Sequence, residues 1–150
     1  MRARTAAACA AAAVVVASGC GGAAPDLMAI ERTGSIPGAR LTLRLTDDGR
    51  VSCNGGPLAA ITSQQLIDAR QAVRDLEGEE DEVRPADRDL RLPPGPENGP
   101  DSILAYEVTV RDPPSGSVAW ADTSPGQLPV MQRLALLTRQ IAQGACGLER

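Results

Sequence analysis

Histidine, lysine and phenylalanine are absent from this chain of 150 residues. Without histidine the protein has no imidazole base and no imidazole metal ligand, and without lysine it has no Schiff-base amine and no P-loop lysine. A serine nucleophile would have neither base beside it, which excludes a serine hydrolase. We therefore expect a protein that is not an enzyme and that holds no metal ion and no cofactor.

Aromatic side chains and net positive charge are also scarce. Tyr106 and Trp120 are the only aromatic residues, and both fall on apolar positions of expected strands, where core packing is the ordinary role. A glycosidase using paired carboxylates is disfavoured, because its sugar cleft would need more rings. The 15 basic residues are outnumbered by 19 acidic ones, and the net charge of -4 argues against nucleic-acid binding.

The longest apolar run lies at the N-terminus, where residues 6–16 follow Arg2 and Arg4. This run is about half of the ~20 residues that a helix needs to cross a bilayer. We therefore expect an export signal over residues 1–19 rather than a permanent transmembrane helix.

The signal ends in Ala17-Ser18-Gly19-Cys20, which resembles the lipobox of bacterial lipoproteins. The resemblance implies cleavage before Cys20 and a diacylglyceryl group on its thiol. The alternative is an ordinary secretory signal, cleaved near Ala17 or Ala24, in which Cys20 has no special role.

Lipidation of Cys20 would place the protein outside the cytoplasm, anchored to the outer face of the cell membrane by acyl chains buried in membrane lipid. Residues 20–26, rich in glycine and alanine, are expected to form a short tether. The abundance of alanine and arginine without lysine is typical of a GC-rich bacterial genome, such as that of an actinobacterium.

The four cysteines divide into two groups. Cys9 would leave with the signal and Cys20 would carry lipid, so Cys53 and Cys146 remain. In an oxidising compartment this pair predicts a disulfide that closes a loop of 93 residues. Such a loop is worth ~4 to 5 kcal/mol in the chain-entropy model. A zinc site or a catalytic thiol is disfavoured, since no histidine and no CxxC spacing accompany the pair.

Two segments alternate with the period of a half-buried strand. In residues 39–53 the leucines at 41, 43 and 45 share one face, and an Asp-Gly turn then interrupts the pattern, which predicts a hairpin. Residues 103–120 predict a second hairpin, with Glu107 and Thr109 facing outward. A first strand is expected over residues 27–32.

Two other segments have the helical period. Residues 62–76 begin with the capping-box pair Thr62 and Gln65, and residues 128–143 begin with a proline in the first turn. Between the first helix and the second hairpin, residues 78–102 are rich in proline, glycine and charge, which predicts a long exposed loop.

This order predicts one α+β domain over residues 27–148. Its elements run strand, strand, strand, helix, strand, strand, helix. We expect an antiparallel sheet of about four to five strands, built from the two hairpins, with both helices packed on one face.

Two glycine-rich turns are the candidate binding loops, because glycine allows close backbone approach. They consist of Gly34, Ser35, Ile36, Pro37 and Gly38, and of Asn54, Gly55 and Gly56. The second turn has an equally simple structural explanation, since it follows Cys53. The arginines at 32, 40 and 44 can be interpreted as an anion site or, more simply, as solvated side chains.

Four segments share an order and pattern with a known family. They are an opening strand and turn, the end of the first helix, a strand of the second hairpin, and the start of a leucine-rich helix: IERTGSIPG (30–38), VRDL (73–76), YEVTV (106–110) and LP (128–129). In these segments the folded part resembles the emfourin-type proteins, small bacterial inhibitors of thermolysin-like metallopeptidases. This chain departs from that family in its lipobox, its 78–102 loop and its two mature cysteines. We therefore assign no inhibitory residue from the resemblance.

Two functions follow as hypotheses. The first is a non-catalytic, membrane-anchored module of the cell envelope that binds a protein or a ligand, its partner being another envelope or secreted protein. The second is an emfourin-like peptidase inhibitor, whose partner would be a peptidase.

Overall fold

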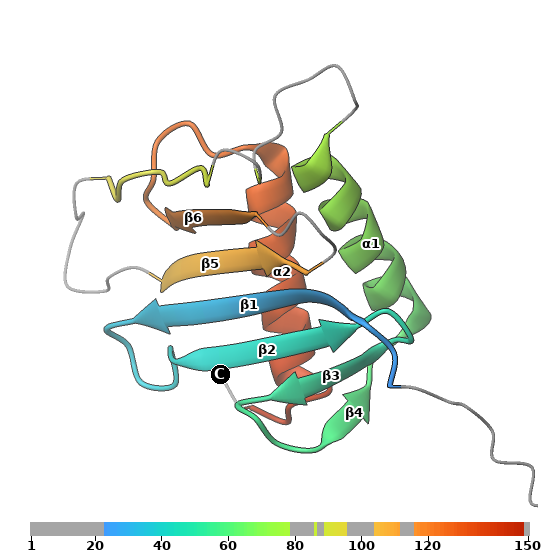
Figure 1. Ribbon diagram of the computed structural model, residues 1–150. Coiled ribbons are helices and arrows are strands. Elements are labelled where there is room, and N and C mark those ends of the chain that lie inside the picture. The colour runs from blue at the N-terminus through green and yellow to red at the C-terminus, as the bar shows by residue number, and fades with distance from the viewer. Residues whose placement is uncertain (1–22, 79–85, 87–88, 96–103, 112–115, 149–150) are drawn as a thin grey trace, which may run out of the picture.

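The computed structural model describes residues 23–78, 86, 89–95, 104–111 and 116–148 (Figure 1). The expected signal peptide and Cys20 lie outside the described residues, as do the first residues of the tether. Of the expected loop at 78–102, Gly78, Ala86 and residues 89–95 are described.

The strands form one six-stranded sheet in the order β4-β3-β2-β1-β5-β6, and all neighbours are antiparallel. The strands are β1 (Asp26–Gly34), β2 (Leu41–Thr46), β3 (Arg50–Cys53), β4 (Leu58–Ala60), β5 (Leu104–Val110) and β6 (Ser117–Ala121). The α+β class is confirmed. The count exceeds the expected four to five because β4 has only three residues, too few to show a strand period.

Both helices pack on one face of this sheet, as expected (Figure 1). Helix α1 spans Ser63–Glu77, and its capping box is formed, since Thr62 accepts from the Gln65 backbone and Gln65 from the Thr62 backbone. Helix α2 spans Pro129–Gln143, with its proline in the first turn.

The core lies between the helices and the helix-facing side of the sheet. Alternate residues of the central strands are at most 1% exposed there: Met28, Ile30, Leu41, Leu43, Leu45, Val51, Val108 and Val110. Tyr106 and Trp120 stack on the same side, with ring centroids 5.2 Å apart, so both aromatic residues are core residues, as predicted.

Cys53 and Cys146 form the expected disulfide, with their Cα atoms 5.8 Å apart. Cys53 is the last residue of β3, and Cys146 follows the end of α2. The bond therefore joins the sheet to the C-terminal helix.

Candidate functional site

The side of the sheet that faces away from the helices, here called the open face, carries mainly short side chains. Strand registers align them in rows. One row is Thr33, Ala105 and Ala121, and another is Ala29, Thr109 and Ser117. Short side chains let another molecule approach the backbone of the sheet closely, which makes this face suited to docking.

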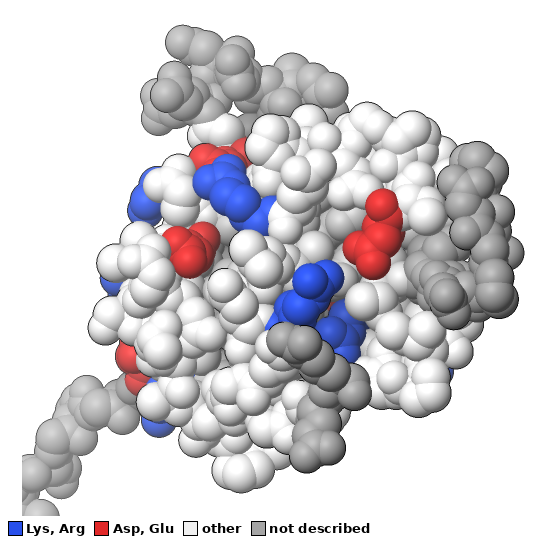
Figure 2. Space-filling model, turned by 180° about the vertical axis from the view of Figure 1, so that it is seen from behind, with Lys and Arg blue, Asp and Glu red and all other residues white. Residues whose placement is uncertain are grey.

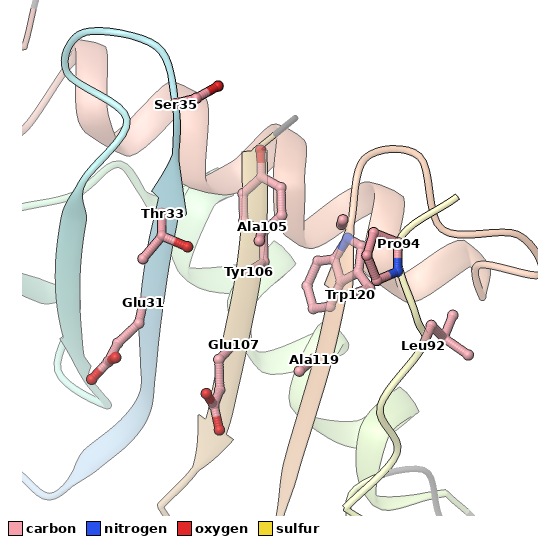
Figure 3. A pocket seen from close by; sticks show the side chains of 11 residues that line it. Glu31, Thr33, Ser35, Leu92, Pro94, Ala105, Tyr106, Glu107, Ala119 and Trp120 are labelled. Atoms are coloured by element: carbon pink, nitrogen blue, oxygen red, sulfur yellow. The ribbon is translucent and has the colours of Figure 1, made fainter. Parts of the chain in front are cut away.

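A groove of about 470 Å³ lies on the open face over β1, β5 and β6 (Figure 3). Thr33 and Ala105 lie along its floor, Ser35 stands at the β1–β2 connection, and Leu92 and Pro94 border it beyond β6. This volume is in the range of pockets that take small ligands or single side chains.

The border formed by residues 89–95 is held against β6 by backbone hydrogen bonds. The Leu92 N–H donates to Ala119 O at 2.9 Å, and the Ala119 N–H donates to Leu90 O at 2.9 Å. Asp89 accepts from the N–H and the hydroxyl of Ser117, both at 3.1 Å. Leu90 and Leu92 are partly buried against the core, so this part of the expected exposed loop packs on the domain.

An ion pair crosses the groove floor above β6. The Arg91 guanidinium donates to Glu107 Oε1 at 2.8 Å, and Ala119 lies between them in the register. Because the side chain of Ala119 is small, the Arg91 side chain can extend across it to Glu107. Glu107 holds the pKa of Arg91 above its usual range through this hydrogen bond and its charge.

Glu31 lies directly opposite Glu107 in the register of β1 and β5. Both carboxylates line the groove. Glu107 has Arg91 as its partner, whereas Glu31 is exposed and makes no hydrogen bond or ion pair with the described residues. The groove therefore has two neighbouring acidic side chains, here called the acidic row, and one apolar border at Leu92 and Pro94.

Trp120 borders the groove beside Pro94 (Figure 3). It is 2% exposed, and its indole nitrogen Nε1 has no hydrogen-bond partner in the described part of the chain. A buried donor without an acceptor costs free energy in the unbound protein. It is the one tryptophan of the chain, so it is also a local spectroscopic probe.

The two candidate binding loops lie at the same end of the sheet, where β1 and β3 end (Figure 1). Ser35 lines the groove, while Ile36, Pro37 and Gly38 line a second cavity of about 520 Å³ beside the end of α2. The structure thus brings only one residue of the two loops into the groove.

The loop after Cys53 is held by the fold. Asn54 has a φ of 51°, and its side-chain oxygen accepts from the Thr42 N–H at 2.9 Å. Ser52 Oγ donates to Gly56 O at 2.7 Å. These bonds favour the structural interpretation of Asn54, Gly55 and Gly56, a turn that closes β3 beside the disulfide.

The three arginines considered for an anion site are separated. Arg44 is on the open face and pairs with Asp26 at 3.6 Å. Arg32 is on the helix-facing side, where its guanidinium donates to Ala39 O at 2.8 Å and to Gly38 O at 3.0 Å. Arg40 is exposed just before β2. The structure does not bring them together.

A polar cluster lies where the sheet ends near α2. Burial, with the nearby charge of Asp122, raises the pKa of the Tyr106 phenol above its usual value, and Arg32 and Arg139 oppose this shift. Burial also raises the pKa of Asp122. Neither group lies on the open face with the acidic row.

The sequence alone did not predict most of the residues that line the groove. The strand alternation correctly placed Glu107 and Thr109 outward, but it could not show that Glu31 is the cross-strand neighbour of Glu107. The border at Leu92 and Pro94 had no signal of its own, since residues 78–102 show no strand or helix period.

Models of known protein families, the curated proteins and the solved structures gave no match. The helices described here are too short or too polar to cross a bilayer. Within the described residues, no group of three or more Cys, Asp or Glu side chains is placed to hold a metal ion.

Proposed function

We propose that this protein is a lipoprotein anchored outside the cell membrane through Cys20, and that it is a non-catalytic module that binds another envelope or secreted protein. The observation that supports binding is the groove on the open face, with its floor of short side chains and its acidic row. Larger side chains pack on the opposite side of the sheet, and on the open face the described residues leave Glu31 and Thr33 exposed to a partner.

Two features of the groove favour binding over catalysis. Glu31 is exposed and Glu107 is held in an ion pair with Arg91, so neither carboxylate stands in a closed site from which water is excluded. The two aromatic rings stack in the core instead of offering a surface for sugars. The arrangement is suited to holding a partner in place.

The helix side offers a less coherent surface. Figure 2 shows it largely covered by uncharged residues, with basic and acidic side chains in small separate groups. The groove between α1 and α2, lined by Gln71 and Leu136 among others, measures only about 160 Å³. The larger cavity of about 520 Å³ lies at the end of α2 beside Ile36, in the loop that is considered below for the second candidate function. We therefore assign the partner to the open face.

The disulfide supports the proposed location, because such bonds persist in oxidising compartments outside the cytoplasm. The chain from Cys20 to the start of β1 at Asp26 reaches at most roughly 20 Å when fully extended. An anchored domain would therefore work close to the membrane surface.

The anchor is tested by the variant Cys20→Ser in cells that make the full chain. We expect the wild-type protein in the membrane fraction with the mass of an acylated N-terminal cysteine, and the variant without lipid. The matched variant Cys9→Ser, which alters the expected signal instead, should be acylated like the wild type. A wild-type mass without added lipid would refute the anchor.

Binding is tested by photocrosslinking in the same cells. A photoreactive amino acid at Thr33, exposed on the floor of the groove, is compared with one at Asp68, exposed on α1. We expect a defined crosslinked protein from position 33 and none from position 68. Equal crosslinking from both positions, or none from position 33, would refute the assigned face.

The second candidate, a peptidase inhibitor, is favoured by one observation. Ile36 is 44% exposed at the tip of a loop that Arg32 ties down through Gly38 O and Ala39 O. A braced loop with an exposed apolar side chain can enter a peptidase subsite. This candidate predicts inhibition of a thermolysin-like peptidase that is lost in Ile36→Ser and kept in Leu58→Ser, an equally exposed site on β4.

A further inference from the structure

We propose that the groove takes an arginine side chain of the partner protein, carried on a short apolar segment, with its guanidinium against Glu31. This inference rests on the proposed function and names what the open face recognises. It follows from the charge pattern of one row across the sheet.

That row reads Thr42, Glu31, Glu107, Ala119 and Arg91 across five neighbouring segments. Directly opposed side chains have Cβ atoms about 4.5–5.5 Å apart, so the two carboxylates repel each other in the unbound protein. Arg91 compensates one of them through Glu107 Oε1. Glu31 forms no ion pair with a cation of the described residues, and the nearby Arg44 is paired with Asp26.

A guanidinium from a partner would complete this arrangement. It is planar and can donate two parallel hydrogen bonds to one carboxylate, and it remains charged at any physiological pH. Bound at Glu31, it would relieve the repulsion from Glu107 that the protein alone leaves in place. An anionic segment would increase that repulsion, so charge complementarity selects a cation.

The borders of the groove suit the rest of an arginine side chain and its flanking residues. Leu92 and Pro94 stand on one side, and Ala105 and Ala119 form a low floor. The methylene stem of arginine can lie along such a surface while its charged end reaches Glu31. Flanking apolar residues would bury against the same border.

A second copy of this chain is the weaker occupant. Symmetric pairing of two open faces would bring the acidic rows of both copies together, and like charges placed opposite each other are destabilising. The charge pattern therefore favours a different protein that supplies the missing cation.

The test is a titration of the full chain, in mild detergent, with the blocked peptide acetyl-Val-Arg-Val-amide, followed through backbone amide NMR shifts. We expect saturable shifts at Ala105 and Ala119, and binding at least about fivefold weaker in Glu31→Gln. The matched variant Asp68→Asn removes the same charge from α1 and should bind like the wild type. Because Glu31→Gln removes a repulsion, it is expected to fold.

Four results would overturn the inference. Three are the absence of saturable shifts at Ala105 and Ala119, equal weakening of peptide binding by Glu31→Gln and Asp68→Asn, and equally tight binding of the peptide acetyl-Val-Glu-Val-amide. The fourth is acetyl-arginine-amide binding as tightly as the peptide, which would point to a small guanidinium ligand instead of a protein segment.

The crosslinking experiment distinguishes a wrong arginine assignment from a wrong proposed function. If the crosslink from position 33 persists unchanged in Glu31→Gln, a partner still occupies the open face and only the arginine assignment is wrong. If position 33 gives no crosslink in the wild-type chain, the assignment of the partner to the open face is wrong.

Discussion

Glu31 on β1 and Glu107 on β5 are direct cross-strand neighbours on the open face. Opposed like charges destabilise a sheet by about 0.2–1 kcal/mol. We therefore predict that Glu31→Gln increases the free energy of unfolding by about that amount, measured by urea denaturation at neutral pH and low salt. The gain should shrink in high salt, because both carboxylates are solvent-accessible.

The control is Glu107→Gln, which removes the same repulsion but also the ion pair with Arg91. The increase in the free energy of unfolding should be smaller in Glu107→Gln than in Glu31→Gln. A loss of stability in Glu31→Gln would show that the Glu31 carboxylate has a stabilising partner, which would remove the basis for an unpaired acid in the groove.

The disulfide is predicted to supply a large part of the stability. Removing it in Cys53→Ala/Cys146→Ala frees a loop of 93 residues in the unfolded chain and should cost ~4 to 5 kcal/mol. The measurement is the urea midpoint of the double variant against the wild type. Reductant should lower the wild-type midpoint to a similar value and leave the double variant unchanged. A wild-type midpoint that is insensitive to reductant would contradict the prediction.

Local chemistry explains what the sequence could predict. The leucines at 41, 43 and 45 alternate because β2 buries one face, and Thr62 with Gln65 satisfies the first backbone donors of α1. The disulfide followed from setting aside Cys9, in the expected signal, and Cys20, at the expected lipid site. Each of these features depends on residues close in sequence or on a single remaining pair.

The groove could not be predicted because it depends on long-range register. Glu31 and Glu107 are brought together by pairing between β1 and β5, with α1 and three strands between them in the chain. The Arg91–Ala119 bridge is parallel and isolated, and Arg91 lies in a segment without a strand period, so the sequence does not predict this pairing. Only the folded chain shows that these residues share one row.

We predict that Tyr106 ionises at a higher pH in the folded protein than in the unfolded chain. Burial and the charge of Asp122 raise its pKa above the ordinary value of 10.0. The stability that this shift represents is fully present below about pH 10 and is lost as the pH rises through the folded-state pKa. Since the chain has one tyrosine, absorbance at 295 nm reports this single group.

Two controls accompany the tyrosine titration. In concentrated urea the midpoint should return to the ordinary tyrosine value. In Asp122→Asn the folded-state midpoint should fall, because a negative neighbour is gone. Identical midpoints with and without urea would contradict the burial of the phenol.

The border of the groove is predicted to depend on Gly95. A Cβ atom at this position would overlap the backbone carbonyl of Thr123, which cannot rotate away as a side chain can. In Gly95→Ala the segment 89–95 must therefore shift away from β6, at a cost of about 1–3 kcal/mol. Hydrogen exchange should become faster at the Leu92 and Ala119 amides, whose bonds hold the border.

Gly38→Ala is the matched control, because its added Cβ meets no atom within 4 Å and only its positive φ of 74° is strained. It should cost about 1 kcal/mol and leave exchange at Leu92 and Ala119 unchanged. If the groove binds as proposed, Gly95→Ala should also weaken acetyl-Val-Arg-Val-amide, because Leu92 and Pro94 leave their places beside the floor, while Gly38→Ala should not. Unchanged exchange and unchanged peptide affinity in Gly95→Ala would show that this segment does not shape the binding surface.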